Sequence, residues 1–320
     1  MQTKEEVSGK ESIMNGIKES LAPAVVVSHS RVAQAATGLA DYSRTPNQYV
    51  TVEGTKLAYR TLGNRSDAPP LVLFQHFTGT MDDWDQSMIE GLAKNRTVVI
   101  FENAGIGASE GKTPDSVATM AHYAEGFLDA LHFNKVDILG FSLGGAVAQQ
   151  VLADRPELVR KAILVGTGPQ GAEGFKDLPN IISENMKKSA ETNVPLKALL
   201  FFTATPVGRQ SGLDFVKRIN NHKVDPEPVA SQEVTQAQAK AWITWGLTPA
   251  NNAQLAAIKQ PVLVVNGNDD LIAPTVNSYV LYQHIPTAQL ILYPDSGHGS
   301  LFQYHALFVS QVNTFLDGVR

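Results

Sequence analysis

One stretch constrains the fold more than any other: an apolar segment, a glycine-bracketed serine and a helical segment in direct succession. Residues 136–139 (VDIL) predict a buried strand and residues 146–153 (AVAQQVLA) a helix, joined by residues 140–145 (GFSLGG). A serine at such a join needs small residues two positions before and after it, because strand and helix approach closely there. The stretch predicts that Ser142 is a nucleophile at the end of a strand. The alternative is a tight turn with a surface serine.

The composition limits the classes of partner and chemistry. Hydrophobic residues make up 43% of the 320 positions and charged residues 18%, as in ordinary soluble globular proteins. The formal net charge of −5 argues against nucleic acid or an anionic membrane as a partner, so a small molecule is expected. Because the chain has no cysteine, it can form no disulfide, thiolate nucleophile or thiolate metal site. Oligomeric state is left open by these numbers.

No apolar run approaches the roughly 18 to 20 residues that a membrane-spanning helix requires. Residues 21–27 are apolar, but the segment before them carries Glu5, Glu6, Glu11 and Glu19, which argues against a secretory signal or a transit peptide. We therefore expect a soluble, cytoplasmic protein.

Strand and helix patterns alternate along most of the chain. Residues 1–45 show no clear strand pattern and are interpreted as an N-terminal extension outside the main fold. The alternation that follows implies parallel βαβ units, and hence a doubly wound, mostly parallel sheet with core segments 46–168 and 256–320. A hairpin is predicted at 48–52 and 56–61, strands at 71–74, 97–101, 136–139, 162–165, 261–265 and 289–292, and helices at 116–131 and 301–316.

The alternation fails between residues 169 and 255. This segment has no convincing strand and contains six prolines from Pro179 to Pro249, so it is predicted to be a helical cap over the carboxyl edge of the sheet, where open α/β folds bind ligands. Its aromatic side chains suggest an apolar pocket between cap and sheet, although each one alone could simply join the cap to the core. The candidate pocket residues of the cap are Phe201, Phe202, Trp242 and Trp245.

A serine nucleophile needs a base to accept its proton and an acid to orient that base. His298 follows the strand at 289–292 in a small-residue loop, which makes it the candidate base. The strand at 261–265 runs into an acidic turn with Asp269 and Asp270, and spacing alone does not choose between these two carboxylates.

These motifs together resemble the α/β-hydrolase-fold serine hydrolases that carry a helical lid. The resemblance covers about residues 47 to 320. In that family the acid commonly lies three residues after a glycine and four before a proline, which here implies Asp270 rather than Asp269. The histidine of the family ends a short Gly-His turn, which Gly297 and His298 match.

The resemblance also implies an oxyanion hole made of two backbone N–H groups. One is that of Leu143, directly after the nucleophile. The family carries the second in a His-Gly loop, where this chain has residues 75–80 (QHFTGT). An ungapped match places Phe77 as the second donor. It also puts His76 at the position of the glycine, where its side chain is expected to form a wall of the pocket.

Two further segments are interpreted as structural. Residues 101–109 (FENAGIGAS) stand where the superfamily has an Asp-x-Arg-Gly-x-Gly-x-Ser turn, and they are expected to form a tight turn after a strand. Asp82, Asp83 and Asp85 have no histidine at metal-ligand spacing, so a solvated helix start is expected instead of a metal site. No Gly-x-Gly-x-x-Gly follows the first strand, so no dinucleotide cofactor is expected.

The leading hypothesis is a cofactor-independent, carboxylesterase-like serine hydrolase. Its substrate would be an ester, lactone or thioester of a small, largely apolar molecule, cleaved through an acyl-enzyme. The same triad also suits a carbon–carbon bond hydrolase, a cofactor-free haloperoxidase or perhydrolase, and a hydroxynitrile lyase, because fold does not choose function. A rival of another class is a ligand-binding receptor that retains the triad.

Overall fold

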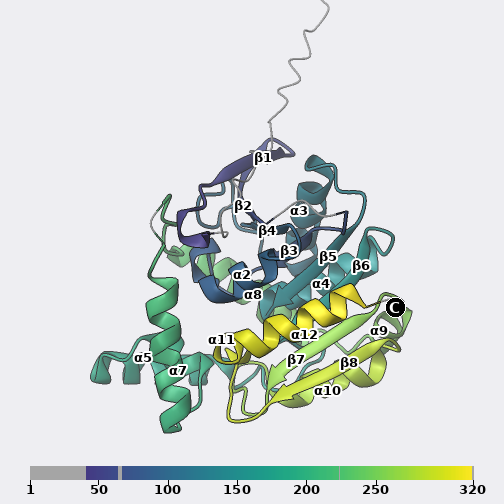
Figure 1. The fold of residues 1–320 in the computed structure, drawn as a ribbon. Coiled ribbons are helices and arrows are strands. Elements are labelled where there is room, and N and C mark those ends of the chain that lie inside the picture. Colours follow the sequence, from purple (N-terminus) through teal and green to yellow (C-terminus); the bar gives the residue numbers. More distant parts are fainter. Residues whose placement is uncertain (1–40, 64–66, 223, 319–320) are drawn as a thin grey trace, which may run out of the picture. The chain divides into compact units, whose positions relative to one another are not determined.

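The computed structural model describes residues 41–63, 67–222 and 224–318. Its described residues form one eight-stranded sheet in the order β1-β2-β4-β3-β5-β6-β7-β8 (Figure 1). β2 is antiparallel to β1 and β4, and every other neighbouring pair is parallel, which confirms the predicted mostly parallel sheet. The strands are β1 (Gln48–Val52), β2 (Thr55–Leu62), β3 (Leu71–Phe74), β4 (Val98–Phe101), β5 (Val136–Phe141), β6 (Val159–Val165), β7 (Val262–Gly267) and β8 (Ala288–Tyr293).

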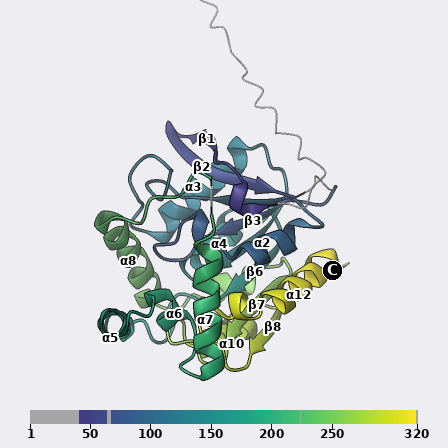
Figure 2. The same ribbon diagram turned by 60° about the vertical axis from the view of Figure 1, so that its left-hand side comes forward.

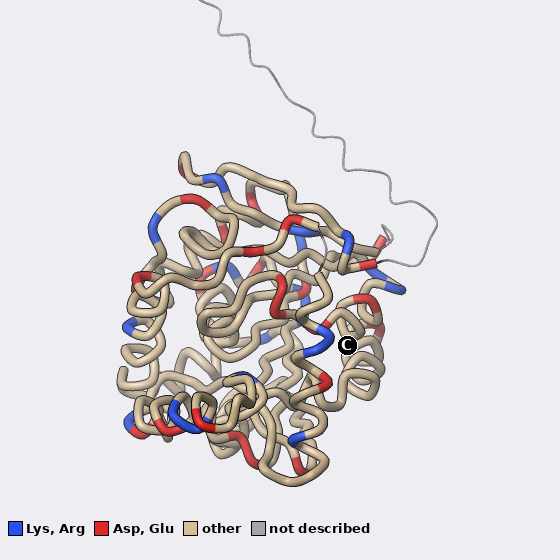
Figure 3. The backbone as a smooth tube through the Cα atoms, turned by 90° about the vertical axis from the view of Figure 1, so that its left-hand side faces the viewer, with Lys and Arg blue, Asp and Glu red and all other residues tan. Residues whose placement is uncertain are grey.

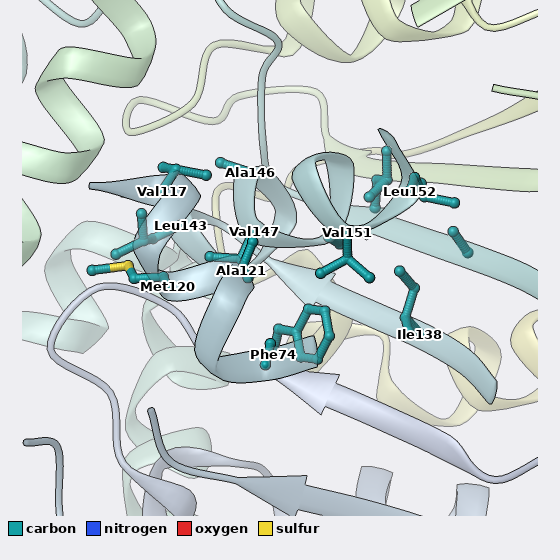
Figure 4. Close-up of a cluster of buried hydrophobic side chains, with 14 of the residues drawn as sticks. Phe74, Val117, Met120, Ala121, Ile138, Leu143, Ala146, Val147, Val151 and Leu152 are labelled. Carbon is teal, nitrogen blue, oxygen red and sulfur yellow. The ribbon is translucent and has the colours of Figure 1, made fainter. Parts of the chain in front are cut away.

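Both faces of the sheet are buried at its centre, and the central strands β3 and β4 are apolar at every position. In β3, Leu71 and Leu73 join the hydrophobic cluster on one face, whereas Val72 and Phe74 join the cluster on the other. This is the two-residue period of a strand covered on both sides. On one face pack α2 (Gln86–Ala93) and α12 (His305–Asp317), and on the other α3 (Val117–Ala130), α4 (Leu143–Asp154) and α10 (Thr275–His284). Figure 4 shows Phe74 and Ile138 of the sheet beneath side chains of α3 and α4.

Two predicted boundaries differ from the structure. The extension does not reach residue 45, because the 3₁₀ turn η1 (Tyr42–Arg44) packs on the core with Tyr42 buried and its hydroxyl donating to Met81 O; residues 1–40 lie outside the described part. The closing helix is divided into α11 (Ser300–Gln303) and α12, because Tyr304 leaves the helical conformation (φ −103°, ψ 30°) and stacks on Tyr293.

Residues 169–255 form helices and no strand within their described part. Proline begins some of these helices instead of breaking them: Pro206 is the first residue of α7, where its missing N–H is not needed. Figure 1 shows α5 and α7 at the end of the sheet toward which β7 and β8 point, and Figure 2 shows them beside α6. The helices are α5 (Leu178–Thr192), α6 (Leu196–Phe201), α7 (Pro206–Ile219), α8 (Gln232–Leu247) and α9 (Asn252–Ala257).

Two further features of the described chain are the distribution of its charged residues and the character of its helices. Figure 3 shows Lys and Arg interspersed with Asp and Glu along the folded backbone. None of the helices in the described ranges combines the length and the apolar content needed to cross a bilayer.

Candidate active site

Ser142 stands at the join of β5 and α4 in an uncommon backbone conformation, with φ 57° and ψ −119°. Three glycines permit the sharp turn. A Cβ on Gly144 would be 2.1 Å from Phe74 O, and one on Gly140 would be 2.4 Å from Gly144 O. A Cβ on Gly145 would lie 2.6 Å from an atom of the Thr167 side chain. These short distances explain why all three positions are glycine, because any larger residue would push strand and helix apart.

His298 and Asp270 are joined by a buried hydrogen bond of 2.8 Å between Nδ1 and Oδ2. The other oxygen of Asp270 accepts from the backbone N–H groups of Ile272 and Ala273, at 2.8 and 2.9 Å, so the carboxylate is held in place. Because an ionised carboxylate only accepts, His298 Nδ1 carries the proton and Nε2 has the free lone pair that a base needs. Asp269, the alternative acid, is exposed.

The imidazole of His298 lies next to the elbow. A Cβ on Gly166, directly after β6, would be 3.2 Å from His298 Nδ1, and the ring centroids of His298 and Phe141 are 4.9 Å apart. Ser142 follows Phe141, and its N–H donates to Val165 O at 2.9 Å, so Ser142 and His298 lie beside the same two segments. No direct hydrogen bond joins these two side chains among the described contacts; such bonds are often long in substrate-free enzymes and tighten in the complex.

The backbone N–H groups of Phe77 and Leu143 lie next to the elbow and have no acceptor among the described residues. Leu143 is the first residue of α4, so its N–H cannot be satisfied inside the helix. Phe77 lies in the loop after β3, which Gly144 approaches. A pair of free N–H groups at a serine elbow is the arrangement that an oxyanion hole requires.

In the loop around Phe77, every other backbone N–H group donates a hydrogen bond. Thr78 has φ 57°, an unusual value for a β-branched residue. The remaining N–H groups of residues 76–80 all donate: His76 to Gln75 Oε1 (2.8 Å), Thr78 to Gln238 Oε1 (2.6 Å), Gly79 to His76 O (3.1 Å) and Thr80 to Asp83 Oδ2 (2.8 Å).

His76 is buried and neutral. Burial, followed by the nearby Lys197 ammonium, lowers the pKa of His76 to about 3. Its Nδ1 bonds to Phe77 O at 2.8 Å, which assigns the proton to Nδ1 and leaves Nε2 without a partner among the described residues. Its ring lies 5.3 Å from the rings of both Phe141 and Phe201. A histidine with this pKa is unprotonated at neutral pH.

The three aspartates after this loop are not a solvated helix start, which corrects the expectation from the sequence. Asp85 is fully buried, caps α2 and binds Arg218 Nε of α7 at 2.7 Å. Asp83 pairs with Lys197 of α6, and Asp82 Oδ2 accepts from Glu227 N at 2.8 Å. They are half-buried or buried because each holds a different part of the cap. No three His, Asp or Glu side chains within the described ranges are grouped to hold a metal ion.

Two acidic side chains, one in the turn after β4 and one in the cap, come together in a way that the sequence did not reveal. Glu102 is buried, and its carboxylate accepts from Met81 N at 2.8 Å and Ala108 N at 2.7 Å. Glu227 of the cap accepts from the same Ala108 N–H at 2.7 Å and also binds Arg60. Burial, and then the adjacent Glu227, raise the pKa of Glu102 well above its usual value. The two carboxyl groups therefore meet at the Ala108 N–H, between core and cap.

The predicted pocket residues fall into two groups. Phe201 packs on His298, with ring centroids 5.2 Å apart, and Phe202 lines a cavity of about 600 Å³ bounded by α5, α6, α7 and the loops that contain Asp269 and Gly297. The two tryptophans differ: Trp245 joins the cap to the core, whereas Trp242 packs on another residue of the cap segment. Trp242 packs on Phe175 at 4.6 Å, and Trp245 Nε1 donates to Gly168 O at 3.1 Å.

Comparison with known proteins shows which family the chain belongs to. A family model described as alpha/beta hydrolase fold matches residues 69–303. The solved structure of an alpha/beta hydrolase fold protein from Chitinophaga pinensis is 42% identical with a TM-score of 0.82, over 87% of this chain and 99% of that one. A poly(3-hydroxyalkanoate) depolymerase from Ectopseudomonas oleovorans is 28% identical over 79% of this chain and 87% of its own. A proline iminopeptidase from Lactobacillus acidophilus is 26% identical over 82% and 95% respectively.

Proposed function

The chain belongs to the alpha/beta hydrolase fold family, and on that premise we propose that it is a serine hydrolase acting on a carboxylic ester, lactone or thioester. The observation that carries this proposal is the buried bond between His298 and Asp270, set beside a strained Ser142. The names of the depolymerase and iminopeptidase relatives support bond cleavage as the reaction class.

The proposed reaction uses only groups of the chain and water. Ser142 Oγ attacks the carbonyl carbon while His298 Nε2 takes its proton, and Asp270 stabilises the imidazolium that forms. The N–H groups of Phe77 and Leu143 bind the oxyanion. His298 then gives its proton to the leaving oxygen or sulfur, which departs as an alcohol or thiol and leaves an acyl-enzyme. A water, deprotonated by the same histidine, releases the acid and restores Ser142.

A small and largely apolar substrate is supported by the surroundings of the elbow. Leu143 and Trp242 belong to one buried cluster, and the half-buried Phe77, Ile181 and Leu200 pack against it. The cavity of about 600 Å³ reaches the His298 loop at Gly297 and has the usual size of small-molecule sites. Charged side chains such as Lys188 and Arg209 line it and Ser142 does not, so it supports a small substrate but not an apolar one.

The test is turnover of p-nitrophenyl esters over a series of acyl chain lengths, with labelling by a fluorophosphonate probe. We expect both in the wild type, and a fall in kcat of about 10⁴-fold or more in Ser142→Ala with unchanged circular dichroism. A folded wild type that gives neither signal would refute the enzyme and favour a ligand-binding role. Peroxide-dependent halogenation without ester turnover would assign the same site to a haloperoxidase.

A further inference from the structure

Gln238 is a polar residue on the buried face of cap helix α8. It is 3% exposed and lies one helical turn from the buried Val234 on one side and from Trp242 on the other. A buried amide destabilises the fold unless it is hydrogen-bonded, so an apolar residue would be the ordinary choice at this position. The side chain must therefore have a specific partner.

That partner is the loop that carries the Phe77 N–H. Gln238 Oε1 accepts from Thr78 N at 2.6 Å across 160 positions of sequence. Among the described residues, the hydrogen bond from Thr78 N is the polar interaction found for this side chain.

The Phe77–Thr78 peptide is held from both of its ends. Phe77 O accepts from Thr78 Oγ1 at 2.7 Å and from His76 Nδ1 at 2.8 Å, while the N–H of the same peptide binds Gln238. This double restraint is needed because a threonine at φ 57° is strained by about 1–3 kcal/mol and persists only when its surroundings hold it. Without the hydrogen bond to Gln238, the Thr78 backbone can rotate to a negative φ, and that rotation turns the neighbouring Phe77.

We infer that Gln238 is a positioning residue for the oxyanion hole: by fixing Thr78 it aims the Phe77 N–H at the carbonyl oxygen under attack. The inference rests on the proposed serine hydrolase function. It makes the oxyanion hole complete only while α8 is docked, so the cap contributes to the chemical step as well as to the pocket.

The experiment replaces Gln238 with Met, which keeps the length of the side chain but cannot accept the bond from Thr78. We expect kcat with p-nitrophenyl esters to fall about 10- to 1000-fold, where the larger value corresponds to the loss of one oxyanion donor. KM should stay within about threefold of the wild-type value. The rate of fluorophosphonate labelling falls in parallel. The pH profile of kcat/KM stays unchanged, because the His298–Asp270 pair is untouched. Gln236→Met, on the exposed side of the same helix, is the matched control and keeps wild-type rates.

A double-mutant cycle separates positioning from general destabilisation. Glycine adopts positive φ without strain, so in a Thr78→Gly background the further loss caused by Gln238→Met shrinks at least about fivefold. If Gln238→Met does not fold, Gln238→Ala, which adds no bulk, takes its place in the cycle. Two results with an active wild type would overturn this inference and leave the proposed function standing. In one, the Gln238 variant keeps kcat within about twofold of wild type; in the other, it loses the same factor in both backgrounds. A folded wild type with neither turnover nor labelling refutes the proposed function, and the inference with it.

Discussion

Replacement of Ser142 by glycine should make the protein more stable than replacement by alanine. Both variants lack the hydroxyl, so their difference isolates the Cβ in a backbone conformation of φ 57° and ψ −119°. That conformation is retained because Ser142 N and O are bonded to Val165 and Gly145, at 2.9 and 2.8 Å. Strain of this kind costs about 1–3 kcal/mol, and the greater freedom of glycine in the unfolded chain offsets about 0.5–1 kcal/mol. The expected net advantage of glycine is about 0.5–2 kcal/mol.

Urea unfolding followed by tryptophan fluorescence measures this difference. With a slope of about 1–3 kcal/mol/M or more, the advantage moves the midpoint by a few tenths of a molar. The matched control is Ser183 on the exposed side of α5, where the helical backbone reverses the order and alanine is more stable than glycine by about 1 kcal/mol. If Ser142→Gly is no more stable than Ser142→Ala while the control pair behaves as expected, the elbow is not strained and this reasoning is wrong.

Three further changes test other parts of the site. The pKa of Glu102 is raised in the folded protein, so the contribution of this group to stability is present at low pH and is lost as the pH rises toward the raised pKa. The melting temperature of Glu102→Gln should therefore increase relative to that of wild type from pH 5 to pH 8. A difference in melting temperature that stays constant over this range would contradict the buried pair. Gly144→Ala, whose Cβ would lie 2.1 Å from Phe74 O, should lower the free energy of unfolding by about 3 kcal/mol or more in urea titrations; an unchanged midpoint would show that the elbow can open. Asp270→Asn should reduce kcat with esters by about 10⁴-fold while the exposed Asp269→Asn stays near wild type, and equal losses would argue against the assignment of the acid.

Much of the fold was predictable because its signals are local. Short apolar runs such as 71–74 identify strands buried on both faces, and the glycines around Ser142 are explained by backbone contacts within a few ångströms of the turn. The choice of Asp270 over Asp269 required the resemblance to a family. In the structure the Asp270 carboxylate bonds His298, while that of Asp269 faces solvent.

The contacts between cap and core were not predictable, because they join residues far apart in sequence. Asp85 was expected to be solvated, yet Arg218 reaches it across 133 positions. Gln238 carried one readable signal, an amide on the apolar stripe of a helix, but its partner depends on how the cap docks. The pairing of Glu102 with Glu227 likewise depends on two loops meeting in space, which no periodicity encodes.

The contacts of residues 78–85 bear on how such enzymes diversify and how they can be recombined. In a short span, this segment holds α6 through Asp83, α7 through Asp85, the approach to α8 through Asp82, and α8 itself through Thr78. A cap transplanted from another protein would form these bonds only if it carried the same partners or if residues 78–85 were exchanged along with it. The cap and residues 78–85 thus form one structural unit made of two separate stretches of the chain. A chimera that exchanges both stretches together should keep its cap docked and its catalytic rate.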